Sequence, residues 1–181
     1  MKKILAFALA LALLAACAPT TAQPVAQPMA TPQVKSKPFL LVFYNFYSEW
    51  KGFPGGSFPI AAFTTAYQNV LKFNNYRFEP VRGLSSACKP MAEYDSSAVN
   101  RRIKTVNAGK ALIVEVVVAS RVNPKVTVCA SFMAPTDQRN AMTTSSVERS
   151  SDASAYSSFN DAVAALTTQA VTDVIAAEEL R

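Results

Sequence analysis

The sequence predicts one α/β (α+β) domain over residues 39–181, in which about three helices pack on a mixed β-sheet in the order β-α-β-α-β-β-β-α. Three observations predict this class. Two long apolar runs, 39–47 and 111–122, have the composition of buried strands. Residues 60–73 repeat their apolar side chains at helical spacing, and residues 160–179 do the same at the end of the chain. Because the two patterns alternate, we expect helices and sheet to form two or three layers.

The first half of the domain predicts a strand, a helix and a second strand. Segment 48–59 is rich in glycine and proline, which favours a turn between the first strand and the first helix. Asn74-Asn75 is expected to end that helix. Residues 76–82 then predict a short strand, which Pro80 keeps from being fully paired.

The second half predicts one more helix, a meander of strands and the final helix. The helix 96–108 is expected to be closed by Gly109. After the strongest strand, the chain turns and returns as a strand over 125–134. A polar strand at 139–149 has the composition of a sheet edge, and a serine-rich loop is expected at 150–158.

The first 16 residues have the pattern of a secretory signal. Lys2 and Lys3 precede an uninterrupted apolar run, residues 4–16. As a helix this run rises only about 20 Å, which is short of the roughly 30 Å hydrocarbon layer. A positive start, a short apolar core and small residues at its end predict a cleaved signal peptide over 1–16.

The end of the apolar run carries a recognisable motif. Leu14-Ala15-Ala16-Cys17 resembles the lipobox of bacterial lipoproteins. The resemblance implies that the signal is removed before Cys17, that Cys17 carries acyl chains, and that Ala18, in place of Asp, directs the protein to the outer membrane. Several acyl chains are sufficient for stable anchoring. The alternative is an ordinary signal cleaved near Ala16.

Residues 17–38 are expected to form a lipidated, proline-rich tether. The segment lacks the apolar surface needed to offset the chain entropy of folding. Its prolines favour an extended chain of about 3.1 Å per residue, so the tether reaches on the order of 60 Å. Localisation at the outer membrane, lipid-anchored and with the domain facing the periplasm, follows from the resemblance. The sequence leaves a surface-exposed orientation open.

Composition narrows the possible functions. The chain has 18 Lys and Arg against 12 Asp and Glu, and without Lys2 and Lys3 the excess falls from six to four. This mild, scattered charge does not favour nucleic-acid binding. The chain contains no histidine, which excludes Ser-His-Asp and Cys-His catalysis and histidine-ligated metals. We expect no cofactor, no metal ion and no enzyme activity.

Two cysteines remain beside Cys17. Cys88 lies in a loop flanked by glycine, serine and proline, and Cys129 lies in a strand. An even number of cysteines in an oxidising compartment predicts a disulfide between them. The alternative is two unpaired, buried thiols.

The turn-rich segment contains the candidate partner-binding residues Trp50, Phe53 and Phe58. Large aromatic side chains on a polar, glycine-rich loop are typical of recognition surfaces. The same side chains can instead fold back as a lid on the core, and the sequence leaves this alternative open.

Acidic residues offer little for catalysis. Glu93 and Asp95 form the nearest approach to a catalytic pair, but Asp95 has a sufficient role as a helix cap. Glu115 interrupts an apolar strand, and burying it unpaired would be costly. A structural salt bridge with Lys125 or Arg121 is therefore expected.

Four basic residues predict a modest basic face, namely Arg101, Arg102, Lys104 and Lys110. Such a face can contact anionic glycan or phospholipid head groups. A solvated helix face explains it equally well.

The lipobox, the proline-rich tether and the element order together resemble a group of periplasmic outer-membrane lipoproteins. The group includes penicillin-binding-protein activators, auxiliary lipoproteins of lipid transporters and domains like the TolB N-terminal domain. The resemblance implies a non-catalytic binding, regulatory or assembly module for an envelope protein complex, held at the membrane by its lipid anchor. The alternative is a lipid- or small-ligand-handling component of a transport system. The oligomeric state is left open.

Overall fold

The computed structural model describes residues 37–48, 59–83, 88, 96–120 and 122–181, which belong to one compact unit, Ser36–Arg181. In chain order its elements are β1 (Leu40–Ser48), α2 (Ile60–Phe73), β2 (Phe78–Arg82), α3 (Ser96–Thr105), β3 (Lys110–Ala119), β4 (Lys125–Ala134), β5 (Met142–Asp152), a short 3-10 turn η2 (Ala153–Ala155) and α4 (Phe159–Glu179). The predicted fold class and element order are confirmed. No helix in the described ranges combines the length and apolar character needed to cross a membrane.

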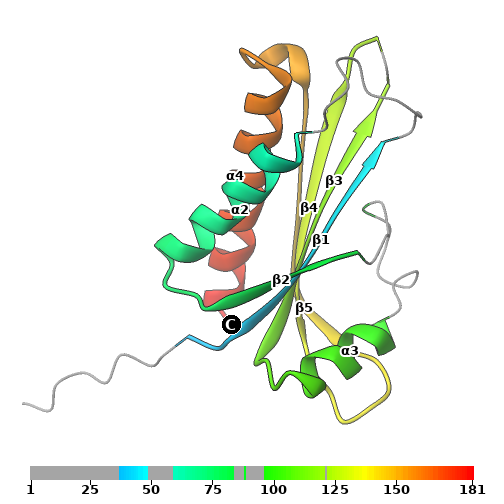
Figure 1. Cartoon of the computed structure of the whole chain (residues 1–181), viewed down its shortest axis with the longest axis vertical. Helices are drawn as coiled ribbons and strands as arrows, with labels where there is room; N and C mark the ends of the chain where they lie inside the picture. Colours follow the sequence, from blue (N-terminus) through cyan, green and yellow to red (C-terminus); the bar gives the residue numbers. More distant parts are fainter. Residues whose placement is uncertain (1–36, 49–58, 84–87, 89–95, 121) are drawn as a thin grey trace, which may run out of the picture. The chain divides into compact units, whose positions relative to one another are not determined.

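The sheet is mixed, with the strand order β2-β1-β3-β4-β5 (Figure 1). β1 pairs in parallel with both β2 and β3, while β3, β4 and β5 form an antiparallel meander. Because parallel neighbours need a crossover, α2 connects β1 to β2, and α3 connects β2 to β3. β1 therefore lies between the two strands that the crossovers reach.

The two faces of the sheet are covered unequally. α2 and α4 pack on one face and bury the larger core, which includes Val114, Val116 and Val128. α3 packs on the other face over a smaller core that includes Ile113 and Met133. The stripe predicted for the last helix is confirmed, since Val163, Leu166, Ala170 and Val174 are all buried. Alternate residues of β3 thus serve different cores, as the period of a strand requires.

Asparagine ends both crossover helices. Asn75 and Asn107 have positive φ angles, 59° and 52°. The N–H of Asn107 bonds to the carbonyl of Lys104, and the next N–H bonds to that of Ile103, which is the Schellman arrangement. The prediction that Gly109 closes α3 at 108 is wrong, because Asn107 already ends the helix. Gly109 serves close packing instead, since a Cβ there would lie 2.4 Å from Cβ of Pro38.

β5 lies at the sheet edge as expected, but three residues later than its predicted range. The strand continues to Asp152 because Ser150 pairs with Thr127, and their hydroxyl oxygens lie 3.0 Å apart. The serine-rich loop expected from residue 150 therefore begins as paired strand. Cross-strand hydroxyl pairs stabilise such a polar edge. At the other edge, Pro80 stands in β2 opposite Val42, where its missing N–H is tolerated.

Candidate functional site

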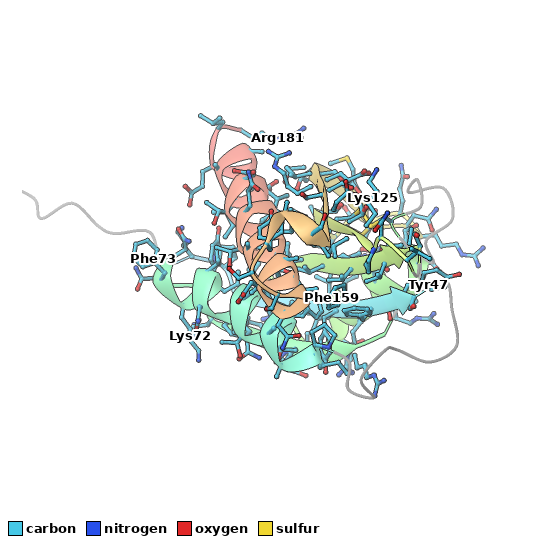
Figure 2. All side chains as sticks on the ribbon, turned by 90° about the horizontal axis from the view of Figure 1, so that it is seen from above. Tyr47, Lys72, Phe73, Lys125, Phe159 and Arg181 are labelled. Atoms are coloured by element: carbon cyan, nitrogen blue, oxygen red, sulfur yellow. A yellow bond between two sulfur atoms is a disulfide. The ribbon has the colours of Figure 1, made fainter. Side chains whose placement is uncertain are left out.

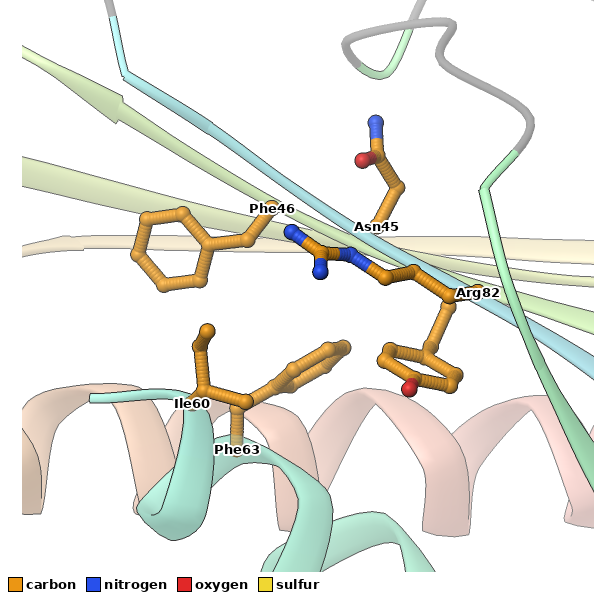
Figure 3. Close-up of a pocket in the computed structure, with 6 residues that line it drawn as sticks. Asn45, Phe46, Ile60, Phe63 and Arg82 are labelled. Carbon is orange, nitrogen blue, oxygen red and sulfur yellow. The ribbon is translucent and has the colours of Figure 1, made fainter. Parts of the chain in front are cut away.

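A cavity of about 430 Å³ opens where β1 and β2 end and α2 begins (Figure 3). Its described lining residues, which define the β1–α2 cavity, are Tyr44, Asn45, Phe46, Ile60, Phe63 and Arg82. The chain leaves β1 through α2 on one face of the sheet and later reaches β3 through α3 on the opposite face. The carboxyl end of β1 is therefore a topological switch point, where open α/β sheets commonly bind ligands.

The alternation of side chains along each strand and the register between strands determine the direction in which the cavity side chains point. Tyr44 and Phe46 lie two residues apart on β1, so both face the side of α2 and α4. Asn45, between them, points to the other side of the sheet (Figure 3). Arg82 of β2 stands opposite Tyr44 in the parallel ladder, so its side chain emerges on the same face. Figure 3 shows its guanidinium group extending past the rings toward Phe46.

Aromatic rings from β1 and α2 form the floor of the cavity. The centroid of the Phe63 ring lies 6.4 Å from that of Tyr44, 6.4 Å from that of Phe46 and 5.5 Å from that of Tyr67. Phe63 and Tyr67 meet because residues four apart share one face of a helix. Each such ring pair adds about 0.5–1.5 kcal/mol beyond the burial of its area. The floor is therefore held in place before any ligand binds.

The electrostatic character of the β1–α2 cavity is positive. Arg82 is exposed, and within the described part of the chain it has neither an ion-pair nor a hydrogen-bond partner. It is also the one charged residue among the described lining residues. α2 begins at the cavity with no side-chain cap and no acidic residue in its first turn, so the positive end of its dipole is not neutralised by its own sequence. Burial raises the pKa of Tyr67, whose ring packs against Phe63.

The predicted partner-binding residues Trp50, Phe53 and Phe58 lie outside the described residues, as does the lipidation site Cys17. The segment that contains the three aromatics joins Ser48 to Pro59. Phe46, three residues before residue 49, and Ile60, two residues after residue 58, both line the β1–α2 cavity.

Sequence reasoning missed the residues that line the cavity. It placed the apolar residues of 60–73 on one helical face, which is correct for the buried Phe63 and wrong for Ile60, which is 43 % exposed. It did not single out Tyr44, Phe46 or Arg82. The aromatic residues in the second half of β1 were a usable signal, because large aromatic side chains are typical of binding surfaces. Arg82 carried no local signal at all.

The structure joins Cys88 and Cys129 in a disulfide, with their Cα atoms 5.7 Å apart. Cys129 stands opposite Glu115 in the β3–β4 ladder. Glu115 is 1 % exposed, and its Oε2 accepts a hydrogen bond of 3.0 Å from the backbone N–H of Cys88. The disulfide therefore holds the backbone N–H of Cys88 against the buried side chain of Glu115. Lys125, one expected partner of Glu115, stands opposite Ala119 instead, and Arg121 lies outside the described residues.

The expected basic face is divided between two sides of the sheet. Arg101, Arg102 and Lys104 belong to α3, but Lys110 of β3 pairs with Glu178 of α4 on the opposite face. The prediction of one face containing all four residues is therefore wrong. The charge of Arg102 is also partly balanced by an acidic residue, because its Nη2 lies 3.7 Å from Oε1 of Glu79.

The carboxylate of Glu178 has three described partners. Its side chain is 7 % exposed. Besides Lys110, the hydroxyls of Thr144 and Ser145 each donate to its Oε2 at 2.7 Å. Burial alone raises the pKa of Glu178, but the hydrogen bonds from Lys110, Thr144 and Ser145 outweigh it and hold the pKa below its usual value. This network ties the end of α4 to β3 and β5 and is structural.

Glu93 and Asp95, the nearest approach to a catalytic pair in the sequence, lie outside the described residues. In the ranges that the structure does describe, no three acidic or cysteine side chains converge as a metal site would require.

No protein-family model and no curated protein matches the chain. Solved structures with a distantly similar arrangement include the PelC dodecamer from Paraburkholderia phytofirmans, with a TM-score of 0.43 and 11 % identity over 74 % of this chain and 85 % of that one. They also include the LpoB C-terminal domain from Salmonella enterica, with a TM-score of 0.37 and 11 % identity over 67 % and 87 %. Lipoprotein GNA1162 from Neisseria meningitidis has a TM-score of 0.37 and 17 % identity over 77 % and 99 %. At these scores the likeness concerns the arrangement of elements and assigns no function.

Proposed function

We propose that this chain is an outer-membrane-anchored lipoprotein whose periplasmic domain is a non-catalytic binding module for an envelope protein complex. The β1–α2 cavity is its recognition surface. One observation carries this proposal: an exposed arginine without a described partner, Arg82, lies over an apolar floor of aromatic rings. Aromatic residues and arginine dominate the binding energy of protein interfaces. A preformed floor also lowers the entropy cost of binding.

The position of the cavity in the domain supports this role. Lys37, the first described residue, donates a hydrogen bond of 2.5 Å to Glu179 at the end of α4 and lies 4.5 Å from the centre of the Tyr76 ring. The chain therefore enters the domain beside its own C-terminus (Figure 1). From there, β1 runs six residues from Leu40 to Phe46, about 20 Å, to the cavity. With a tether attached at Cys17, the cavity lies away from the point where the chain enters the domain.

Photocrosslinking in cells tests the proposal with a matched pair of positions on α2. Ile60 lies at the cavity and is 43 % exposed, whereas Phe73 lies at the other end of the same helix and is 88 % exposed. Figure 2 shows Phe73 far from Tyr47, which is near the end of β1. A photoreactive residue at 60 is expected to capture one discrete envelope protein that position 73 does not. Equal capture from both positions would contradict the proposed surface.

A small apolar ligand is the second candidate, because the cavity volume of about 430 Å³ falls within the range of small-molecule sites. Away from this cavity, Val114, Val128 and Val171 between the sheet and α4 are completely buried. Mass spectrometry of the protein purified from its native membrane distinguishes the two. A stoichiometric co-purifying lipid that Ile60→Glu removes would favour ligand handling.

A further inference from the structure

We infer that the β1–α2 cavity recognises a carboxylate carried next to an apolar side chain, in a peptide segment of the envelope partner. This inference rests on the proposed function and specifies the chemistry of the same site.

Charge identifies the polar half of the ligand. Arg82 brings a positive charge that no described residue neutralises, and the uncapped start of α2 adds a partial positive charge beside Ile60 and Phe63. No acidic residue is among the described lining residues. A guanidinium group presents parallel N–H donors that match the two oxygens of a carboxylate. The complementary group is therefore an anion with planar, paired oxygens.

The floor identifies the apolar half. Tyr44 and Phe46 are only partly buried and present ring surface to the cavity, with the buried Phe63 ring packed against both, and Ile60 adds an exposed apolar edge. Figure 3 shows the Phe46 ring beside the guanidinium group of Arg82. A volume of about 430 Å³ is far larger than a bare phosphate or carboxylate group requires. A free phosphate would also leave the rings uncovered and would find only one cation. An aromatic or large aliphatic side chain beside the carboxylate fills this volume and covers the rings.

A peptide segment meets both requirements in the setting proposed here. Acidic residues next to large apolar residues are common on proteins, and a peptide can bring the two groups side by side. The chain's own Glu49 is the competing internal occupant, because it follows β1 directly in sequence and lies outside the described residues. A test must therefore separate an external carboxylate from Glu49.

The experiment uses the full mature chain with Cys17→Ser and three matched probes, namely 4-phenylbutyrate, 4-phenyl-1-butanol and 4-phenylbutylamine. Binding is followed by the backbone amide resonances of Phe46, Ile60 and Arg82. We expect saturable shifts with the butyrate, binding about tenfold or more weaker for the alcohol, and none that saturate for the amine. Arg82→Gln should reduce butyrate affinity to that of the alcohol. Arg101→Gln, at an exposed position on α3, should leave all three affinities unchanged.

Three results would overturn the inference. The butyrate and the alcohol could bind equally, which would make the site purely apolar. Inorganic phosphate could compete with the butyrate more strongly than acetate does, which would make it a phosphate site. If the butyrate bound only to the Glu49→Gln variant, the carboxylate of Glu49 in the chain itself would be the group that pairs with Arg82. None of these three results affects the crosslink from position 60, which tests the proposed function separately. Failure of the inference is therefore distinguishable from failure of the proposed function.

Discussion

Replacing Glu178 by Gln is expected to destabilise the domain strongly at neutral pH and much less in acid. The substitution removes a charge that Lys110, Thr144 and Ser145 all contact. Hydrogen bonds to a charged group contribute about 1.5–3 kcal/mol each, and glutamine keeps part of them. Lys110 is about one-third exposed, so water hydrates its charge once the carboxylate is gone. The loss of this ion pair therefore adds little to the cost in stability. The expected cost is about 2–3 kcal/mol in the free energy of unfolding.

The pH dependence follows from the direction of the pKa shift. The pKa of Glu178 is lower in the folded chain than its ordinary value of 4.5, so the folded state binds its proton less readily than the unfolded state. The stabilisation is therefore complete above about pH 4.5 and is lost as the pH falls through the folded pKa. The difference between wild type and Glu178→Gln should shrink correspondingly below pH 4.5.

Urea unfolding at pH 7 and at a series of acidic pH values, with the disulfide intact, measures this difference. Glu179→Gln is the matched control, because the neighbouring Glu179 is half exposed and pairs only with Lys37 among the interactions described for it. An exposed pair of this kind contributes at most about 1 kcal/mol. Equal costs for the two variants at pH 7, or a Glu178→Gln deficit that persists undiminished in acid, would refute the reasoning.

Three further changes test the packing by urea unfolding. Reducing the Cys88–Cys129 disulfide, which links residues 41 apart, is expected to cost about 4 kcal/mol in the chain-entropy model. Gly109→Ala should cost roughly 1–3 kcal/mol, because the new methyl group meets Pro38, with 2.4 Å between the Cβ atoms. Phe63→Ala removes a ring that is 1 % exposed, so we expect a loss of about 3–5 kcal/mol.

Each of these three changes has its own contradicting outcome. Unchanged unfolding after complete reduction would mean that Cys88 is held in place without its disulfide. A neutral Gly109→Ala would mean that the chain around Pro38 moves aside freely. A loss below about 1 kcal/mol for Phe63→Ala would mean that the cavity floor is not packed as described.

Most of the fold was predictable because its signals are local. The apolar run of β1, the helical stripe of α4 and the strand composition of β3 each lie within one stretch of sequence. Details set by neighbouring segments were less predictable. Gly109 appeared to be a helix terminator because glycine often is one, but Asn107 ends α3 and Gly109 accommodates Pro38.

The site was less predictable because its residues meet only through the sheet. Arg82 and Tyr44 are distant in sequence and become neighbours through the parallel register of β1 and β2. Similarly, Lys110 looked like part of a basic face until the strand placed it on the side of α4. Nothing in the sequence around either residue encodes that pairing, so only the assembled sheet reveals it.

The account depends most on the β1–α2 cavity as the surface that binds an envelope partner. The most direct measurement is the affinity of the purified protein for the protein captured from position 60, determined by calorimetry for wild type, Arg82→Glu and Arg101→Glu. The account predicts binding at least about tenfold weaker for Arg82→Glu, as expected for an interface hot spot, and unchanged binding for Arg101→Glu. Equal affinity of wild type and Arg82→Glu would contradict it.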